Sequence, residues 1–202
     1  GGFWICSVDS RMHRLVTDSL PFVTIKADYR ATVGTLRYPR IIEDNQGVIR
    51  LALLKEGLWY LLTDDYGTYT GIGKSVGSAE GQEYISLFED SVGNLWLGCS
   101  DQSIHKYSVK DNTVFKYHLP VKPSHSDTNP ISVIQEDSEG NIYICYASYG
   151  LFIAEGGKEP IKPFLSWYEL TDVKEGFIIV DFVITERNEV WVATIDGLYK
   201  TD

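Results

Sequence analysis

Several features that define common protein classes are scarce or absent in this sequence. The 202 residues contain only three cysteines, Cys6, Cys99 and Cys145, and they form neither a CxxC pair nor a zinc-type spacing with histidine. No stretch approaches the roughly 20 apolar residues of a membrane-spanning helix. Acidic residues outnumber basic ones by 28 to 18, and the net charge of −10 repels phosphate backbones. We therefore expect cysteines that are small buried apolar side chains, no metal or other cofactor, and no nucleic acid partner.

One stretch that is present, residues 89–99, combines a turn with apolar runs on both sides. It reads Glu-Asp-Ser-Val-Gly-Asn-Leu-Trp-Leu-Gly-Cys and follows an apolar run at residues 85–88. Gly93 can adopt the positive φ of a tight turn, and Asp90 can accept hydrogen bonds from its own backbone there. Because the flanking aromatic and aliphatic residues favour strands, the stretch predicts a β-hairpin.

Weaker copies of this stretch recur along the whole chain. They lie at residues 43–52, 136–145 and 185–193, and the first residues of the chain align with residue 93 onward. The position of the central Trp is occupied, in order, by Trp4, Arg50, Trp96, Tyr143 and Trp191. The steps between these positions are 46, 46, 47 and 48 residues. The residues predicted to build the recurrent turns and the buried wedge beside them are Asp44, Gly47, Asp90, Gly93, Trp96, Asp137, Gly140, Tyr143 and Trp191.

This period accommodates four short strands, and the expected fold is all-β, a β-propeller fragment of four-stranded antiparallel blades. The strand after each turn is apolar on both faces, as at Leu95, Trp96 and Leu97, which is typical of a sheet packed between two neighbours. Helical repeats would need a 3.6-residue pattern, which does not occur. The expected first strands lie at residues 84–89, 131–135 and 178–184, and an expected fourth strand lies at 113–118.

The whole chain is expected to be one partial propeller, residues 1–202. Its predicted blades are residues 1–37, 38–83, 84–129, 130–176 and 177–202. The first of these begins at its second strand, and the last lacks its fourth. Incomplete blades present open strand edges, so we also expect the chain to self-associate.

The repeated pattern of Asp-Ser-x-Gly-Asn-Leu-Trp-Leu-Gly and then Gly-Leu-Tyr resembles the two-component regulator propeller repeat. That repeat occurs in the periplasmic sensor region of bacterial hybrid two-component systems, especially those that control polysaccharide use in gut Bacteroidetes. The match is weaker where Arg50 replaces Trp and where residues 185–188 read Thr-Glu-Arg-Asn. The resemblance implies a periplasmic sensor segment that signals to a histidine kinase outside this chain, with further blades and domains. It carries over no catalytic residue.

The repeated residues themselves are not expected to perform chemistry. Because Glu43, Glu89 and Glu136 recur once per blade, they cannot converge as a retaining glycosidase pair, whose carboxyl groups lie roughly 5 Å apart. Loops that do not repeat are better candidates, since their rings can stack on sugars and their arginines can meet acidic groups. The candidate ligand-binding residues are Tyr29, Arg30, Tyr149, Trp167 and Tyr168, with Arg37 in a loop of the same kind.

Three functions remain open at this point. The first is the sensing of an oligosaccharide or other small ligand, with no catalysis in this segment. The second is a propeller scaffold that binds proteins and no small ligand, and the third is a propeller carbohydrate-active enzyme. Binding and turnover assays on a set of oligosaccharides would separate them.

Overall fold

The computed structural model describes residues 3–6, 12–15, 23–25, 40–53, 57–63, 69–74, 83–121, 131–166 and 178–201. The chain divides into two compact units, Gly1–Tyr84 and Ile85–Asp202. The described strands all pair with antiparallel neighbours, so the all-β expectation is confirmed. Within the described residues, no helix has the length and apolar character needed to cross a membrane.

The first unit holds one three-stranded and one four-stranded sheet. The three-stranded sheet contains β1 (Phe3–Cys6), β2 (Met12–Leu15) and β3 (Val23–Ile25). The four-stranded sheet contains β4 (Arg40–Glu43), β5 (Ile49–Leu53), β6 (Gly57–Thr63) and β7 (Tyr69–Lys74). Apolar residues of β5 and β6, among them Ile49, Leu51 and Leu58, are buried.

The second unit holds three sheets whose strands follow one another along the chain. The first contains β8 (Tyr84–Glu89), β9 (Asn94–Cys99), β10 (Ser103–Ser108) and β11 (Thr113–His118). The second contains β12 (Ile131–Glu136), β13 (Ile142–Tyr146), β14 (Gly150–Ala154) and β15 (Lys162–Ser166), with the 3-10 helix η1 (Glu155–Gly157) after β14. The third contains β16 (Ile179–Ile184), β17 (Val190–Thr194) and β18 (Gly197–Thr201).

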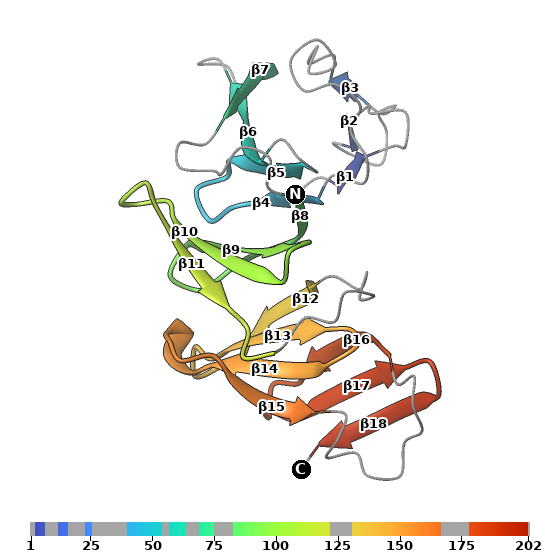
Figure 1. Cartoon of the computed structure of the whole chain (residues 1–202). Coiled ribbons are helices and arrows are strands. Elements are labelled where there is room, and N and C mark those ends of the chain that lie inside the picture. The colour runs from blue at the N-terminus through green and yellow to red at the C-terminus, as the bar shows by residue number, and fades with distance from the viewer. Residues whose placement is uncertain are drawn as a thin grey trace. The chain divides into compact units, whose positions relative to one another are not determined.

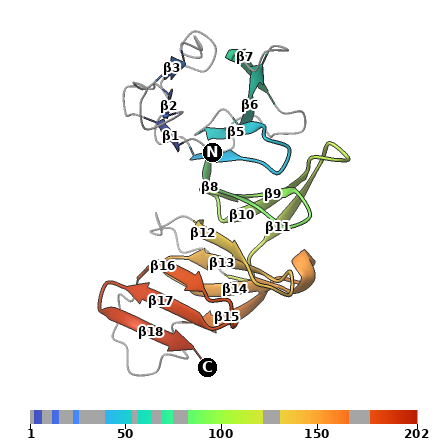
Figure 2. The same cartoon turned by 180° about the vertical axis from the view of Figure 1, so that it is seen from behind.

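The β12–β15 sheet lies between the other two sheets of this unit in both views (Figures 1 and 2). Apolar side chains fill the space on each of its faces. Towards β8–β11 the buried cluster includes Trp96, Ile131, Ile144 and Phe152. Towards β16–β18 the buried cluster includes Tyr143, Cys145, Leu151, Phe182 and Val192. The expectation of strands buried on both faces is therefore confirmed for β9 and β13.

The strand expectations agree closely with the observed bounds. Strands β8 and β11 span the expected residues, β12 extends one residue further, and β16 begins one residue later. The burial expected of the cysteines holds for Cys99 and Cys145, whereas the side chain of Cys6 lies outside the described residues.

Candidate functional site

Four turns with the same backbone geometry join the first and second strands of the described sheets. In the turn that starts at Asp90, the N–H of Gly93 donates to the carbonyl of Asp90, and the N–H of Asp90 donates to the carbonyl of Asn94, both at 2.9 Å. The turns that start at Asp44, Asp137 and Thr185 repeat both hydrogen bonds. The sequence of the last turn departs from the pattern, but its geometry does not.

The fourth residue of each turn has a positive φ. The value is 77° at Gly47, 85° at Gly93 and 82° at Gly140, which explains why glycine recurs there. In the last turn the residue is Asn188, at 59°, and asparagine tolerates this region better than other residues with a side chain. Asn188 therefore substitutes for glycine without changing the turn.

The first residue of each turn holds the turn together with its side chain. Asp90 Oδ1 accepts hydrogen bonds from the N–H groups of Val92 at 3.2 Å and Asn94 at 2.7 Å. Asp44 and Asp137 accept the equivalent pairs, and Thr185 Oγ1 accepts them at 3.3 and 3.2 Å. The side chains of these first residues therefore stabilise the backbone of their own turns.

The second carboxylate oxygen is paired with the residue at the Trp position of the repeat. Trp96 Nε1 donates to Asp90 Oδ2 at 2.8 Å, and Arg50 Nε donates to Asp44 Oδ2 at 2.9 Å. Arg50 therefore fills the role of the missing Trp, because both side chains place an N–H donor at the same carboxylate.

The other two repeats have related pairs, Tyr143 with Asp137 and Trp191 with Glu189. Burial raises the pKa of Tyr143, and the Asp137 carboxylate that accepts its hydrogen bond raises it further. In the last repeat the turn begins with Thr, and Glu189 is the acceptor instead. Hydrogen bonds from Lys200, at 2.7 Å, and from Trp191 lower the pKa of Glu189.

The strand that follows supplies a partner for the same aromatic or basic side chain. Lys106 Nζ lies 4.8 Å from the centre of the Trp96 ring, and Lys200 Nζ lies 6.0 Å from that of Trp191. Both lysines are directly opposite their Trp in the strand register. Neither lysine was predicted from the sequence, although both occur on the third strand of a repeat that has Trp at the central position. Such cation–π pairs stabilise the sheet and make the Trp ring part of its packing.

Polar side chains also connect neighbouring sheets of the second unit. Ser91 donates from its N–H and its hydroxyl to the Glu136 carboxylate, at 2.6 and 2.8 Å. Gln135 donates to the Phe182 carbonyl at 2.8 Å and accepts from the Ile184 N–H at 3.3 Å. Lys106 Nζ donates to the Gly157 carbonyl at 3.0 Å. The repeated polar residues therefore have structural partners in this structure.

Only one of the five candidate ligand-binding residues falls within the described residues. Tyr149 lies in the loop between β13 and β14, half-buried, with its ring stacked on that of Tyr146 at 4.7 Å between centres. One face of the Tyr149 ring is thus covered. Tyr29, Arg30, Trp167 and Tyr168 lie outside the described residues, as does Arg37.

Among the described residues, no three His, Cys, Asp or Glu side chains are grouped so that they could hold a metal ion. The two cysteines whose side chains are described, Cys99 and Cys145, are buried, and burial raises the pKa of Cys145 to about 12. A thiol with that pKa is almost entirely protonated at neutral pH, so Cys145 is a poor nucleophile.

The comparisons with known proteins agree with the repeated geometry. Residues 79–101, which include the turn at Asp90, match the family described as "Two component regulator propeller". No curated protein sequence matches the chain.

Solved structures share the fold at low sequence identity. An extracellular domain assigned to a one component system of B. thetaiotaomicron matches with a TM-score of 0.70 and 16% identity, over 99% of this chain and 26% of that domain. A second extracellular domain from the same organism, assigned to a hybrid two component system, matches with a TM-score of 0.69 and 16% identity, over 100% of this chain and 27% of that one. Virginiamycin B lyase from Staphylococcus aureus matches with a TM-score of 0.61 and 10% identity, over 100% of this chain and 70% of the lyase.

The matched B. thetaiotaomicron domains are much longer than this chain, which spans about a quarter of their length. The antiparallel sheets of three or four strands match those of propeller proteins, and the expected resemblance to the two-component regulator propeller repeat is confirmed.

Proposed function

We propose that this chain is part of the extracytoplasmic sensor region of a hybrid two-component system, located in the periplasm. In this proposal residues 1–202 form one part of a propeller, which senses a ligand and signals to a histidine kinase outside the chain. The observation that carries the proposal is the match of residues 79–101 to the two component regulator propeller, repeated in geometry at three further turns.

The chemistry of the repeated residues supports binding over catalysis. The carboxylates of Asp44, Asp90 and Asp137 serve their own turns, and Glu136 accepts two hydrogen bonds from Ser91. Each of them therefore has a structural role in its turn or between neighbouring sheets. The non-repeating loops then carry the recognition, with Tyr149, and with Tyr29, Arg30, Trp167 and Tyr168, as the proposed contacts.

We propose an oligosaccharide as the ligand class. An exposed aromatic face contributes stacking on a sugar ring, and neighbouring polar groups fix the orientation of the sugar. The half-buried ring of Tyr149 is held in place by its stack on Tyr146, so it would lose little freedom on binding.

A binding screen tests this proposal. The chain would be titrated with a set of neutral and acidic oligosaccharides by calorimetry, and turnover of the same set would be followed by chromatography. We expect saturable binding without turnover, weakened roughly tenfold by Tyr149→Ala, since about 1.4 kcal/mol of lost stacking corresponds to a factor of ten. Phe115→Ala, on the exposed strand β11, is the matched control and should bind as the unmodified chain does.

Other results would favour the remaining functions. Turnover of any oligosaccharide would favour the carbohydrate-active enzyme. Binding of none of them, together with saturable binding of a protein, would favour the scaffold and overturn the ligand class proposed here.

A further inference from the structure

Two hairpin loops of the second unit have the same length and the same closing hydrogen bond. In the β9–β10 loop the N–H of Gln102 donates to the carbonyl of Cys99 at 3.2 Å. In the β13–β14 loop the N–H of Tyr149 donates to the carbonyl of Tyr146 at 2.9 Å. Gln102 and Tyr149 therefore occupy equivalent positions in consecutive repeats. The facing residue pairs that flank the two loops are Gly98 with Ile104 and Cys145 with Leu151.

The two loops lie at the same end of the contact between the β8–β11 and β12–β15 sheets. A Cβ built on Gly98, where β9 ends, would lie 2.7 Å from Ile131 Cγ2, where β12 begins. Ile131 is paired with Tyr146, and the Tyr149 ring is stacked on that of Tyr146. Tyr149 also packs against the buried cluster to which β10 contributes. The loop that contains Gln102 therefore adjoins the loop that contains Tyr149.

The backbone of Gln102 has a conformation that glutamine rarely adopts. Its φ is 66°, in the left-handed region that favours glycine. The other two non-glycine residues with a positive φ in the described part of the chain, Asn112 and Asn188, are asparagines, which tolerate this region better. Such strained positions are concentrated at ligand-binding and catalytic sites, where the side chain itself is needed. The strain at Gln102 thus points to a role for its carboxamide.

The Gln102 carboxamide is available to a ligand. Gln102 is half-buried, and its side chain makes no hydrogen bond within the residues that the structure describes. The neighbouring carboxylate of Asp101 is engaged, because it accepts hydrogen bonds from the N–H and hydroxyl of Ser103 and lies 3.4 Å from Lys116 Nζ. A carboxamide offers both donors and an acceptor, so it can pair with adjacent hydroxyl groups of one sugar.

We propose that Gln102 and Tyr149 form one subsite for a neutral oligosaccharide. Tyr149 stacks on a sugar ring, and Gln102 hydrogen-bonds the hydroxyl groups of that sugar and so determines specificity. Neutral sugars are favoured because the Asp101 carboxylate adjoins Gln102 and the chain has a net charge of −10, both of which repel acidic sugars. This inference rests on the proposed function and narrows its ligand class.

Titration calorimetry tests the subsite with maltohexaose, cellohexaose and xylohexaose as neutral probes and trigalacturonic acid as the acidic probe. We expect saturable binding of a neutral probe and weaker binding of the acidic one. Gln102→Glu keeps the size and the backbone conformation of the side chain but removes its N–H donors. It should weaken binding of the neutral probe about fivefold to tenfold, which corresponds to the loss of one hydrogen bond.

Gln102→Gly separates a role in binding from a role in folding. Because glycine adopts this φ without strain, the substitution should raise the urea midpoint of unfolding while it weakens binding of the neutral probe. A residue kept only for packing would not show these opposite effects. Asn112→Gly, at a φ of 52° in the β10–β11 turn, is the matched control and should bind as the unmodified chain does.

The possible failures of the subsite and of the proposed function are distinguishable. Binding of a neutral probe that neither Gln102 substitution weakens overturns the subsite and leaves the proposed function standing. Tighter binding of trigalacturonic acid than of every neutral probe does the same. If no probe binds the unmodified chain, the proposed oligosaccharide ligand fails together with the subsite.

Discussion

At the scale of single residues, the carboxylate of Asp90 accepts several hydrogen bonds within its repeat. It is buried, and it accepts hydrogen bonds from two backbone N–H groups, from the Asn94 amide and from Trp96 Nε1. A charged acceptor makes these bonds stronger than neutral ones. The turn and the buried Trp are therefore held by one side chain.

Replacing Asp90 by Ala should lower the free energy of unfolding by about 2–4 kcal/mol, because the indole N–H and the turn amides lose their acceptor while buried. Urea unfolding at neutral pH measures the loss. Thr185→Ala is the matched control, since its two hydrogen bonds are longer and more exposed, and should cost about 0.5–1 kcal/mol. Equal losses in the two variants would contradict this account of the Asp90 carboxylate.

Individual residues also differ in how much of their role could be predicted from the sequence. The turn at residues 90–93 was predictable, because glycine at a φ of 85° and an Asp that caps its own turn are local features. The common hydrogen-bonding role of Arg50 and Trp96 could not be predicted from the sequence. These side chains share little in size, shape or strand preference, and only the observed N–H donor facing the same carboxylate reveals their common role.

At the scale of elements, the approach of β9 to β12 leaves no room for a side chain at Gly98. A Cβ built there would lie 2.2 Å from Ser86 Oγ and 2.7 Å from Ile131 Cγ2. The Ser86 hydroxyl can rotate away, but Ile131 belongs to the packed core between the two sheets. Glycine fits at this position because it has no side chain to overlap with Ser86 and Ile131.

Gly98→Ala should therefore cost about 1–3 kcal/mol of unfolding free energy through overpacking between the sheets. Ala193→Val enlarges the equivalent, half-buried position of β17 and should cost less than about 1 kcal/mol. Thermal and urea unfolding of both variants measure the difference. A Gly98→Ala protein as stable as the unmodified chain would show that the two sheets do not approach as closely as described.

The elements illustrate what periodicity can and cannot predict. Strand positions such as 84–89 and 113–118 followed from apolar runs and turn residues, and the structure agrees. The connections between sheets did not follow, because Gln135 meets the backbone of β16 only after both sheets have packed. The candidate binding residues are a similar case: Tyr149 was placed in a loop correctly, but its stack on Tyr146 depends on packing within the β12–β15 sheet.

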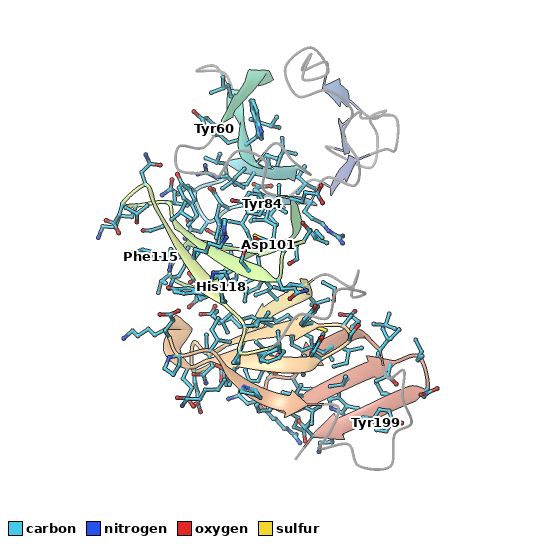
Figure 3. The ribbon with its side chains drawn as sticks, in the orientation of Figure 1. Tyr60, Tyr84, Asp101, Phe115, His118 and Tyr199 are labelled. Carbon is cyan, nitrogen blue, oxygen red and sulfur yellow. The ribbon has the colours of Figure 1, made fainter. Side chains whose placement is uncertain are left out.

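At the scale of the whole molecule, the balance of charge makes stability depend on pH in two opposing ways. The net charge of −10 at pH 7 creates repulsion between carboxylates, which weakens as they are protonated in acid. Buried His105 acts against this trend. Burial lowers its pKa below the ordinary value of 6.5, the charges of Lys116 and His118 lower it further, and Asp101 opposes them. Asp101 and His118 are labelled in Figure 3.

The consequence of the lowered His105 pKa is a loss of stability in mild acid. Because the pKa is lower in the folded than in the unfolded chain, the unfolded chain binds more protons as the pH falls through about 6.5, and folding becomes less favourable. The unfolding free energy should therefore fall between about pH 7.5 and pH 5.5, and His105→Gln should make that fall shallower. His118→Gln, on the exposed strand β11, removes only one of the charges that lower the His105 pKa and should therefore make the fall only slightly shallower. Urea unfolding at a series of pH values measures the slopes, and identical slopes for the unmodified chain and His105→Gln would show that His105 does not govern the acid response.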